Sequence, residues 1–308
     1  MSTTLLLIQL LNGLQFGVLL FLIAAGLTLV FGVMGFINLA HGVQYMIGAY
    51  LTVAFAELTG NFFGALALAL PTALLLGLAL EFLIFRHLYD RDHLDQVLAT
   101  FGVILFVNEA VKVIWGPSPL IVELPEALSA TFQITEGLLY PVYRIVLIGV
   151  GLVVAAILWL VVQRTRVGML IRAGATNPEI VSALGVDIRR LFTIVFGFGA
   201  MLAGFAGALA APIFSVEPNM GDDLLIVAFV VIIIGGIGSI RGAFIAAVLV
   251  GLVDTLGRSV VTDAMRLVFD ASAANQIGPA LASMLVYVFM AGVLFFRPTG
   301  LFPARGSA

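Results

Sequence analysis

The stretch LLLIQLLNGLQFGVLLFLIAAGLTLVFGVM occupies residues 5–34 and contains no charged residue. The hydrocarbon core of a bilayer is roughly 30 Å thick and needs about 20 apolar residues per helix, so this stretch is long enough to cross it. It has neither the basic flank nor the short apolar core of a cleaved signal peptide. We therefore expect residues 5–34 to form a retained membrane span.

The rest of the chain has the same character. Of its 308 residues, 62% are hydrophobic and only 10% are charged, with a mean hydropathy of +1.20. Globular proteins carry about a quarter charged residues, so too few ionic groups exist here to coat a soluble domain. We predict an all-α polytopic transmembrane helix bundle of about eight to ten spans, forming a single transmembrane domain over residues 1–308. The further apolar runs lie at about 42–59, 62–85, 96–115, 140–163, 191–213, 223–240, 242–262 and 277–296.

Several functional classes are excluded by what the sequence lacks. The formal net charge of -3 gives no basic surplus for nucleic-acid binding. There is no cysteine and there are three histidines, so we expect no metal site. The only lysine, Lys112, has no glycine-rich loop before it, so the chain is not a P-loop ATPase. Because no catalytic motif occurs either, we expect a transport protein that is not an enzyme and binds no cofactor.

The distribution of arginine and lysine predicts the orientation. Segments 86–95, 164–190 and 297–308 carry nine of the fourteen basic residues, whereas 116–139 and 214–223 carry acidic residues only. Short cytoplasmic loops retain positive charge, so the basic segments and the C-terminus are expected inside. No basic residue precedes Arg86, and the side of the N-terminus stays open.

Polar residues within the apolar runs are candidates for a translocation pathway or gate, because they are costly in a membrane. Asn12 lies in the first run, and Asn38, His41 and Gln44 follow at three-residue spacing around its end. Each of them could instead make a hydrogen bond between helices. The segment 32–42 is compatible with either a cytoplasmic turn or a broken helix at membrane depth.

The segment GGIGSIRGA (residues 235–243) interrupts two apolar runs with glycines. It is not a dinucleotide-binding fingerprint, because Arg241 stands where the third glycine would be needed. We expect a tight turn between helices or a discontinuous helix. The residues assigned to this helix break or to close packing are Gly235, Gly236, Gly238 and Gly242.

The basic loop 164–190 contains a helix-start signal. The Asn177 side chain can cap the start of a helix, Pro178 fits the first helical turn, and Gly185 would end the helix. A helix over about 178–184 would be too short to span a membrane and would lie on its inner surface. It could serve as a plain connector, or it could dock into a groove on a partner.

The sequence resembles the permeases of ATP-binding-cassette (ABC) importers for branched-chain amino acids, of the LivH type. The resemblance covers essentially the whole chain. It rests on GLTLVFGVMGFINLAHG (26–42), RAGATNPEIVSALGV (172–186), GGIGSIRGAFIAAVLVG (235–251) and RPTGLF (297–302), in that order.

This resemblance implies an ATP-driven importer for branched-chain amino acids in the bacterial inner membrane. The implied partners are a second homologous permease, two cytoplasmic P-loop ATPases that use the ATP, and a periplasmic solute-binding protein. Asn38 and His41 match a family signature, and the match does not assign them a role. The match implies ATPase coupling for Arg172, Ala173, Asn177, Pro178, Glu179, Ala183, Leu184, Gly185 and Val186.

Two other interpretations remain. Related permeases carry urea, short-chain amides and, more distantly, simple sugars, so the substrate could be another small polar solute. The chain could also be a stand-alone channel or a secondary transporter. That interpretation predicts ion-coupling carboxylates deep in the bundle and inverted repeats.

Overall fold

The computed structural model describes residues 3–135 and 138–302. Each apolar run of the sequence forms a helix, which confirms the predicted helical multi-span class. In the described part of the chain these helices are α1 (Thr3–Met34), α2 (His41–Thr59), α3 (Phe62–Leu83), α4 (His93–Trp115), α6 (Val142–Arg164), α9 (Ile188–Ala210), α10 (Asp222–Gly235), α11 (Ile240–Met265) and α12 (Ala271–Phe296).

Seven of these helices are long and apolar enough to cross a membrane. The other two are α2 and α10. Helix α2 has 19 residues and a more polar sequence, and it packs against α1, α3 and α9. Helix α10 has 14 residues and rises only about 20 Å at 1.5 Å per residue, so it is too short for a full span. The span predicted at 223–240 is therefore wrong in length.

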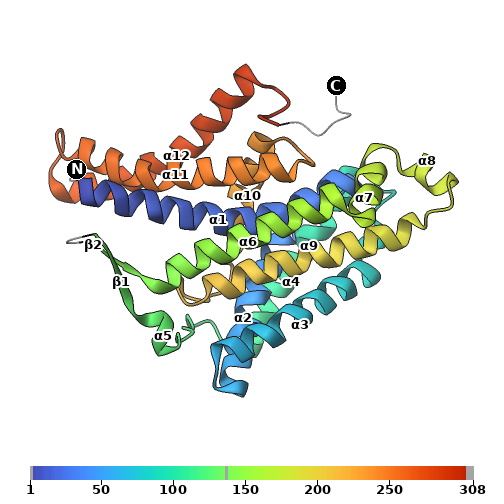
Figure 1. The fold of residues 1–308 in the computed structure, drawn as a ribbon, viewed down its shortest axis with the longest axis horizontal. Coiled ribbons are helices and arrows are strands. Elements are labelled where there is room, and N and C mark those ends of the chain that lie inside the picture. The colour runs from blue at the N-terminus through green and yellow to red at the C-terminus, as the bar shows by residue number, and fades with distance from the viewer. Residues whose placement is uncertain (1–2, 136–137, 303–308) are drawn as a thin grey trace.

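Helix α1 lies at the centre of the bundle, beside α11 and α6 (Figure 1). Glycines allow α1 and α11 to approach closely: a Cβ on Gly13 would lie 3.0 Å from the Cα of Leu252. Further along α1, Gly17 faces Ala247. Helices in lipid associate through close backbone packing, which small residues permit.

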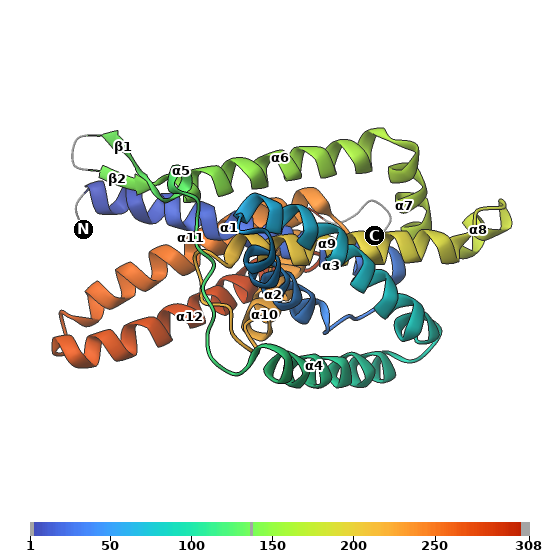
Figure 2. The same ribbon diagram turned by 90° about the horizontal axis from the view of Figure 1, so that it is seen from below.

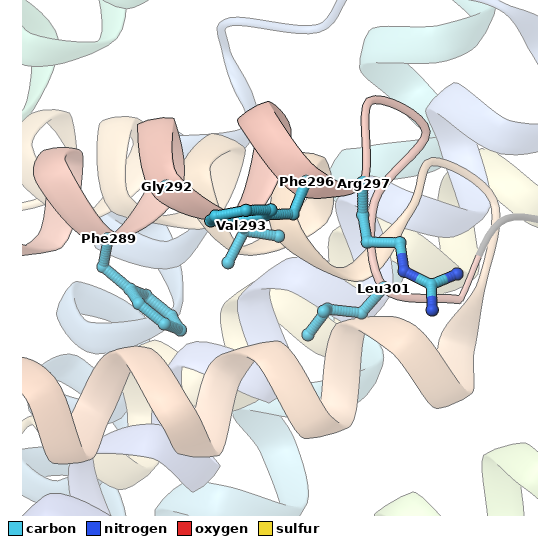
Figure 3. Close-up of a pocket in the computed structure, with 6 residues that line it drawn as sticks. All are labelled: Phe289, Gly292, Val293, Phe296, Arg297 and Leu301. Atoms are coloured by element: carbon cyan, nitrogen blue, oxygen red, sulfur yellow. The ribbon is translucent and has the colours of Figure 1, made fainter.

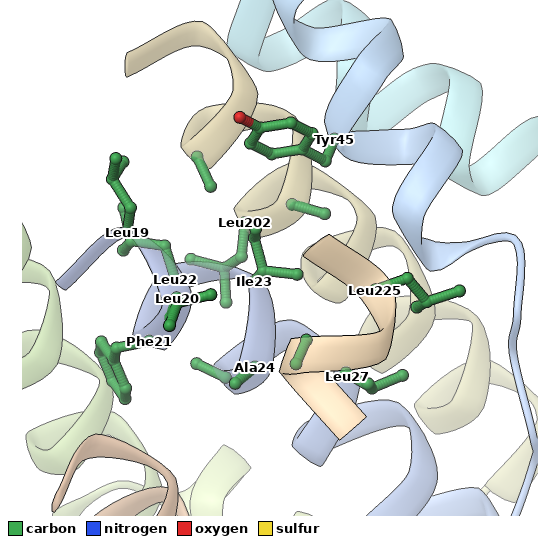
Figure 4. Packing of buried hydrophobic residues seen from close by; sticks show 14 of the residues in the cluster. Leu19, Leu20, Phe21, Leu22, Ile23, Ala24, Leu27, Tyr45, Leu202 and Leu225 are labelled. Carbon is green, nitrogen blue, oxygen red and sulfur yellow. The ribbon is translucent and has the colours of Figure 1, made fainter. Parts of the chain in front are cut away.

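The core is apolar and draws on helices far apart in sequence. Figure 4 shows leucine and phenylalanine side chains of α1 packed beside Tyr45 of α2, Leu202 of α9 and Leu225 of α10. Gly204 of α9 meets Gly48 of α2 without an intervening side chain. Gly204 and Gly207 of α9 thus allow the close contact between α2 and α9.

The two ends of the bundle differ (Figure 2). At one, the hairpin end, β1 (Thr131–Thr135) pairs antiparallel with β2 (Leu138–Pro141), next to α5 (Glu126–Ser129). No strand was predicted there. At the other, the α8 end, lie α7 (Arg166–Thr176) and α8 (Pro178–Ala183). The sequence indicated α8, whereas α7 was not expected.

The segment after α12 returns to the α8 end. The backbone N–H of Leu301 donates to the Ile234 carbonyl at 2.8 Å, beside the turn that joins α10 to α11. That turn packs on Gly32, near the last turn of α1. A Cβ added to Gly174 of α7 would lie 3.9 Å from Cγ1 of Val33 in the same last turn of α1, so α7 packs close to this end of α1.

Candidate functional site

Three of the predicted pathway residues, Asn38, His41 and Gln44, lie in the break between α1 and α2 or in the first turns of α2. Helix α1 ends at Met34, and the next residue, Gly35, has a φ of +63°, which an L side chain adopts only with strain. Six residues later His41 begins α2, and its Nε2 donates to the Ile23 carbonyl at 3.0 Å. Gly26 leaves room for the imidazole, since a Cβ there would lie 2.9 Å from His41 Cε1.

Asn38 and Gln44 flank His41 and are buried. Asn38 is 0% exposed, and neither its side-chain nitrogen nor its oxygen has a hydrogen-bond partner among the described residues. The Gln44 amide is also buried, and its polar neighbour is the His41 side chain. An unsatisfied buried polar group costs about 1–3 kcal/mol. A state in which the Asn38 amide meets water or a ligand would relieve that cost.

The linker between α1 and α2 is held by Gln96 of α4. The Ile37 backbone N–H donates to Gln96 Oε1 at 3.2 Å. Gln96 Nε2 donates in turn to the carbonyls of Leu88 and Arg91, at 3.2 and 3.1 Å. Sequence reasoning missed Gln96, because one glutamine in the first turn of an apolar run looks like an interfacial residue. Its three backbone contacts fix the linker against the segment before α4.

An aromatic cluster connects the same linker to α9. Phe36 packs against Phe85 and Tyr89, with ring centroids 5.6 and 5.5 Å apart. Phe85 belongs to the short 3-10 helix η1 (Phe85–His87). On the other side, Phe196 contacts Phe85 at 5.1 Å and Phe192 contacts Tyr89 at 5.6 Å. These rings therefore form a continuous line of contacts from α9 to the linker.

Tyr89 is fixed within this cluster by a buried carboxylate. Its hydroxyl donates to Glu81 Oε1 at 3.0 Å, and Arg86 pairs with the other Glu81 oxygen at 3.3 Å. Burial, together with the nearby Glu81 carboxylate, raises the pKa of Tyr89, so the phenol stays protonated and keeps donating. The Glu81 side chain is only 1% exposed. The loop before α4 is thus anchored by charge as well as by packing.

The short helix α8 projects from the bundle, joined to it by α7 and α9 (Figures 1 and 2). Asn177 caps it by accepting a hydrogen bond from the Ile180 N–H at 2.9 Å, and Pro178 occupies the first turn. Gly185 ends it with a φ of +88°. Leu184 is 78% exposed. The other residues predicted to couple to the ATPase differ in exposure: Arg172, Glu179 and Ala183 are exposed, and Ala173 and Val186 are partly buried.

The remaining candidates lie elsewhere. Asn12 Oδ1 accepts hydrogen bonds from the Tyr140 hydroxyl at 3.1 Å and from Arg144 Nη1 at 2.6 Å, at the hairpin end and away from His41. The structure therefore does not bring Asn12 together with the other three polar residues. The four glycines lie in and beside the α10–α11 turn, where φ is positive at Gly236 and Gly238. Gly235 and Gly242 face each other across the turn.

Comparison with known proteins identifies the family. A family model described as branched-chain amino acid transport system / permease component matches residues 9–295. The chain belongs to this family. No solved structure matches it.

The permease is similar in length to its relatives. The high-affinity branched-chain amino acid transport system permease protein BraD of Pseudomonas aeruginosa is 28% identical, covering 95% of this chain and 94% of BraD. The corresponding protein LivH of Escherichia coli K12 is 26% identical, covering 93% of this chain and 94% of LivH. A probable LivH permease of Methanocaldococcus jannaschii is 26% identical over 77% of this chain and 76% of that protein.

A cavity of about 300 Å³ lies beside the end of α12 (Figure 3). Phe289, Val293 and Leu301 line it, with Arg297 at its edge. Its wall is apolar, and none of the predicted pathway residues contributes to it. We therefore do not assign this cavity to the translocation pathway.

Proposed function

We propose that the permease forms the translocation pathway of an ATP-driven importer for branched-chain amino acids, together with a second permease subunit. The observation that carries the proposal is the capped, exposed helix α8 at one end of a membrane bundle of this family. Two separate P-loop ATPases would dock there, and a periplasmic binding protein would deliver substrate at the hairpin end. In this proposal the chain binds no cofactor and forms a single transmembrane domain.

The same proposal orients the protein in the membrane. The α8 end carries the basic segments 86–95 and 164–190, so it is assigned to the cytoplasm. The C-terminal segment lies at that end through the Leu301 hydrogen bond and is therefore cytoplasmic too. Helix α1 begins at the hairpin end, which puts the N-terminus outside.

Coupling between ATP and transport follows the contacts already described. A displacement of α8 moves α9, whose first turn is capped by the Asp187 carboxylate accepting from the Arg190 N–H at 3.0 Å. Phe192 and Phe196 on α9 then act on Tyr89 and Phe85, which hold Phe36 in the α1–α2 linker. The importer is proposed to alternate between an outward-open and an inward-open arrangement. ATP binding shifts the population toward the arrangement that binds nucleotide more tightly, by an amount set by the difference in affinity.

The test is an α8 variant in the assembled importer. Ala183→Trp puts a large side chain on the exposed face of α8 and should lower substrate-stimulated ATP hydrolysis and uptake by about tenfold, a loss of roughly 1.4 kcal/mol of coupling. Ala264→Trp, at an exposed position near the other end of α11, is the matched control and should leave both unchanged. Normal stimulated hydrolysis in Ala183→Trp would contradict the assignment of α8 to ATPase coupling.

A further inference from the structure

The start of α10 packs against the first turn of α2, while Asp223 beside this contact stays exposed. Gly221, the residue before α10, packs directly on the backbone of Gly42 in the first turn of α2. The segment between α9 and α10 therefore turns back into the bundle, and Val216 within it is fully buried. Asp222 opens α10 at this point, about 20 Å along the helix from the α10–α11 turn.

Asn108 of α4 contacts Asp222, and Tyr50 of α2 contacts Trp115, which lies seven residues further along α4. Asn108 precedes the end of α4 by seven residues, or about 10 Å of helix. Asn108 Nδ2 donates to Asp222 Oδ2 at 3.4 Å. Tyr50 of α2 packs its ring against Trp115, at 5.0 Å between centroids, and Glu217 is its electrostatic neighbour. We call these five residues the Asp222 cluster.

Two buried polar atoms of the Asp222 cluster lack a hydrogen-bond partner among the described residues. Asn108 is 4% exposed and its Oδ1 has no hydrogen-bond partner among the described residues. The Tyr50 hydroxyl, on a side chain that is 0% exposed, has no partner in the described part of the chain either. Asp222 is partly exposed, and no arginine or lysine within residues 3–135 and 138–302 forms a salt bridge with it.

A carboxylate at membrane depth is costly unless a cation meets it. Here the Asp222 carboxylate and the Asn108 amide oxygen can both accept hydrogen bonds from a ligand. A helix N-terminus by itself favours an anion. In α10 that preference is opposed by two carboxylates, Asp222 and Asp223, in the first turn. The cluster is therefore suited to a cationic hydrogen-bond donor.

We propose that the Asp222 cluster binds the primary ammonium group of the transported amino acid on its way through the permease. This inference rests on the proposed function and deepens it, because it names the substrate group that this chain itself recognises. An ammonium group would donate to Asp222 and to Asn108 Oδ1. Urea and simple amides carry no such charge and would gain little from the carboxylate.

The chain offers a reporter for this site. It contains two tryptophans. One is Trp115 in the cluster, and the other is Trp159 of α6, 43% exposed. Trp159→Phe leaves Trp115 as the sole indole of the full-length permease, which we would study in lipid nanodiscs. Its emission is followed while three related probes are added: leucine, isopentylamine (which lacks the carboxylate) and 4-methylpentanoate (which lacks the ammonium).

We expect saturable changes in emission with leucine and isopentylamine and no change with 4-methylpentanoate. Asp222→Asn in the same background should weaken both responses at least about tenfold, since it removes the charge that faces the ammonium. Asp223→Asn changes the exposed neighbouring carboxylate and is the matched control. A response to 4-methylpentanoate equal to that of leucine, or an unchanged titration in Asp222→Asn, would overturn the proposal.

A second readout separates this proposal from the proposed function. In the assembled importer, Asp222→Asn should retain its ATPase partners and ATP hydrolysis stimulated by the binding protein, while uptake of leucine falls about tenfold or more. Loss of the ATPase partners from the wild-type permease would contradict the importer assignment. Unchanged uptake in Asp222→Asn, with partners retained, would overturn the ammonium site alone.

Discussion

Replacing Gln96 by leucine should loosen the α1–α2 linker and impair transport. The change removes three hydrogen bonds to backbone groups, those with Ile37, Leu88 and Arg91. At about 1 kcal/mol net for each bond, the loss is about 3 kcal/mol, and backbone groups left buried without a partner add to it. Gln96 is 3% exposed, so water does not readily replace the lost partners. We therefore expect a destabilised linker and a slower permease.

The assay combines thermal unfolding in detergent with uptake by the reconstituted importer. Gln96→Leu should lower the melting temperature by several degrees and reduce uptake, while ATPase binding at α8 persists. Gln163→Leu makes the same chemical change at an exposed position of α6 and is the control. If Gln96→Leu melts and transports like Gln163→Leu, Gln96 does not hold the linker and the reasoning is refuted.

Three further variants test other contacts. Gly48→Leu should reduce folded yield and lower the melting temperature, because any Cβ there collides with the Gly204 backbone and overpacking costs about 1–3 kcal/mol; a wild-type melting curve would contradict the α2–α9 packing. Asn177→Ala removes the cap of α8, worth about 1 kcal/mol, and should reduce stimulated ATP hydrolysis without changing the melting temperature of the bundle; undiminished stimulation would show that the cap is dispensable. His41→Ala removes the hydrogen bond to the Ile23 carbonyl and should impair transport with the ATPases still bound. Uptake at the wild-type rate would show that His41 has only a packing role.

The positions of the helices were predictable from the sequence because apolar runs of membrane length leave few alternatives. The cap of α8 was predictable for a similar reason, since Asn177 followed by Pro178 acts locally and needs no tertiary information. The glycine-rich turn before α11 also follows from local chemistry, with positive φ at Gly236 and Gly238. Each of these features depends on residues that are close together in the chain.

The features that sequence reasoning missed depend on contacts between distant segments. Residues 223–240 look like one apolar run, yet α10 ends at Gly235, where Gly236 takes a positive φ. Gln96 and Asp222 acquire their significance only when folding brings them to Ile37 and Asn108, respectively. The β1–β2 hairpin lies in a short segment where alternation of apolar and polar residues is a weak strand signal, and its two strands become recognisable only when they pair.

The central claim is that this permease works with separate ATPases that dock at α8. The most direct measurement is affinity purification of the tagged permease in mild detergent, followed by identification and quantification of the co-purifying chains. We predict a second permease and two P-loop ATPases, with the ATPases lost in Ala183→Trp and retained in Ala264→Trp. Recovery of the permease as a homo-oligomer with no ATPase would contradict the account and favour a self-sufficient channel.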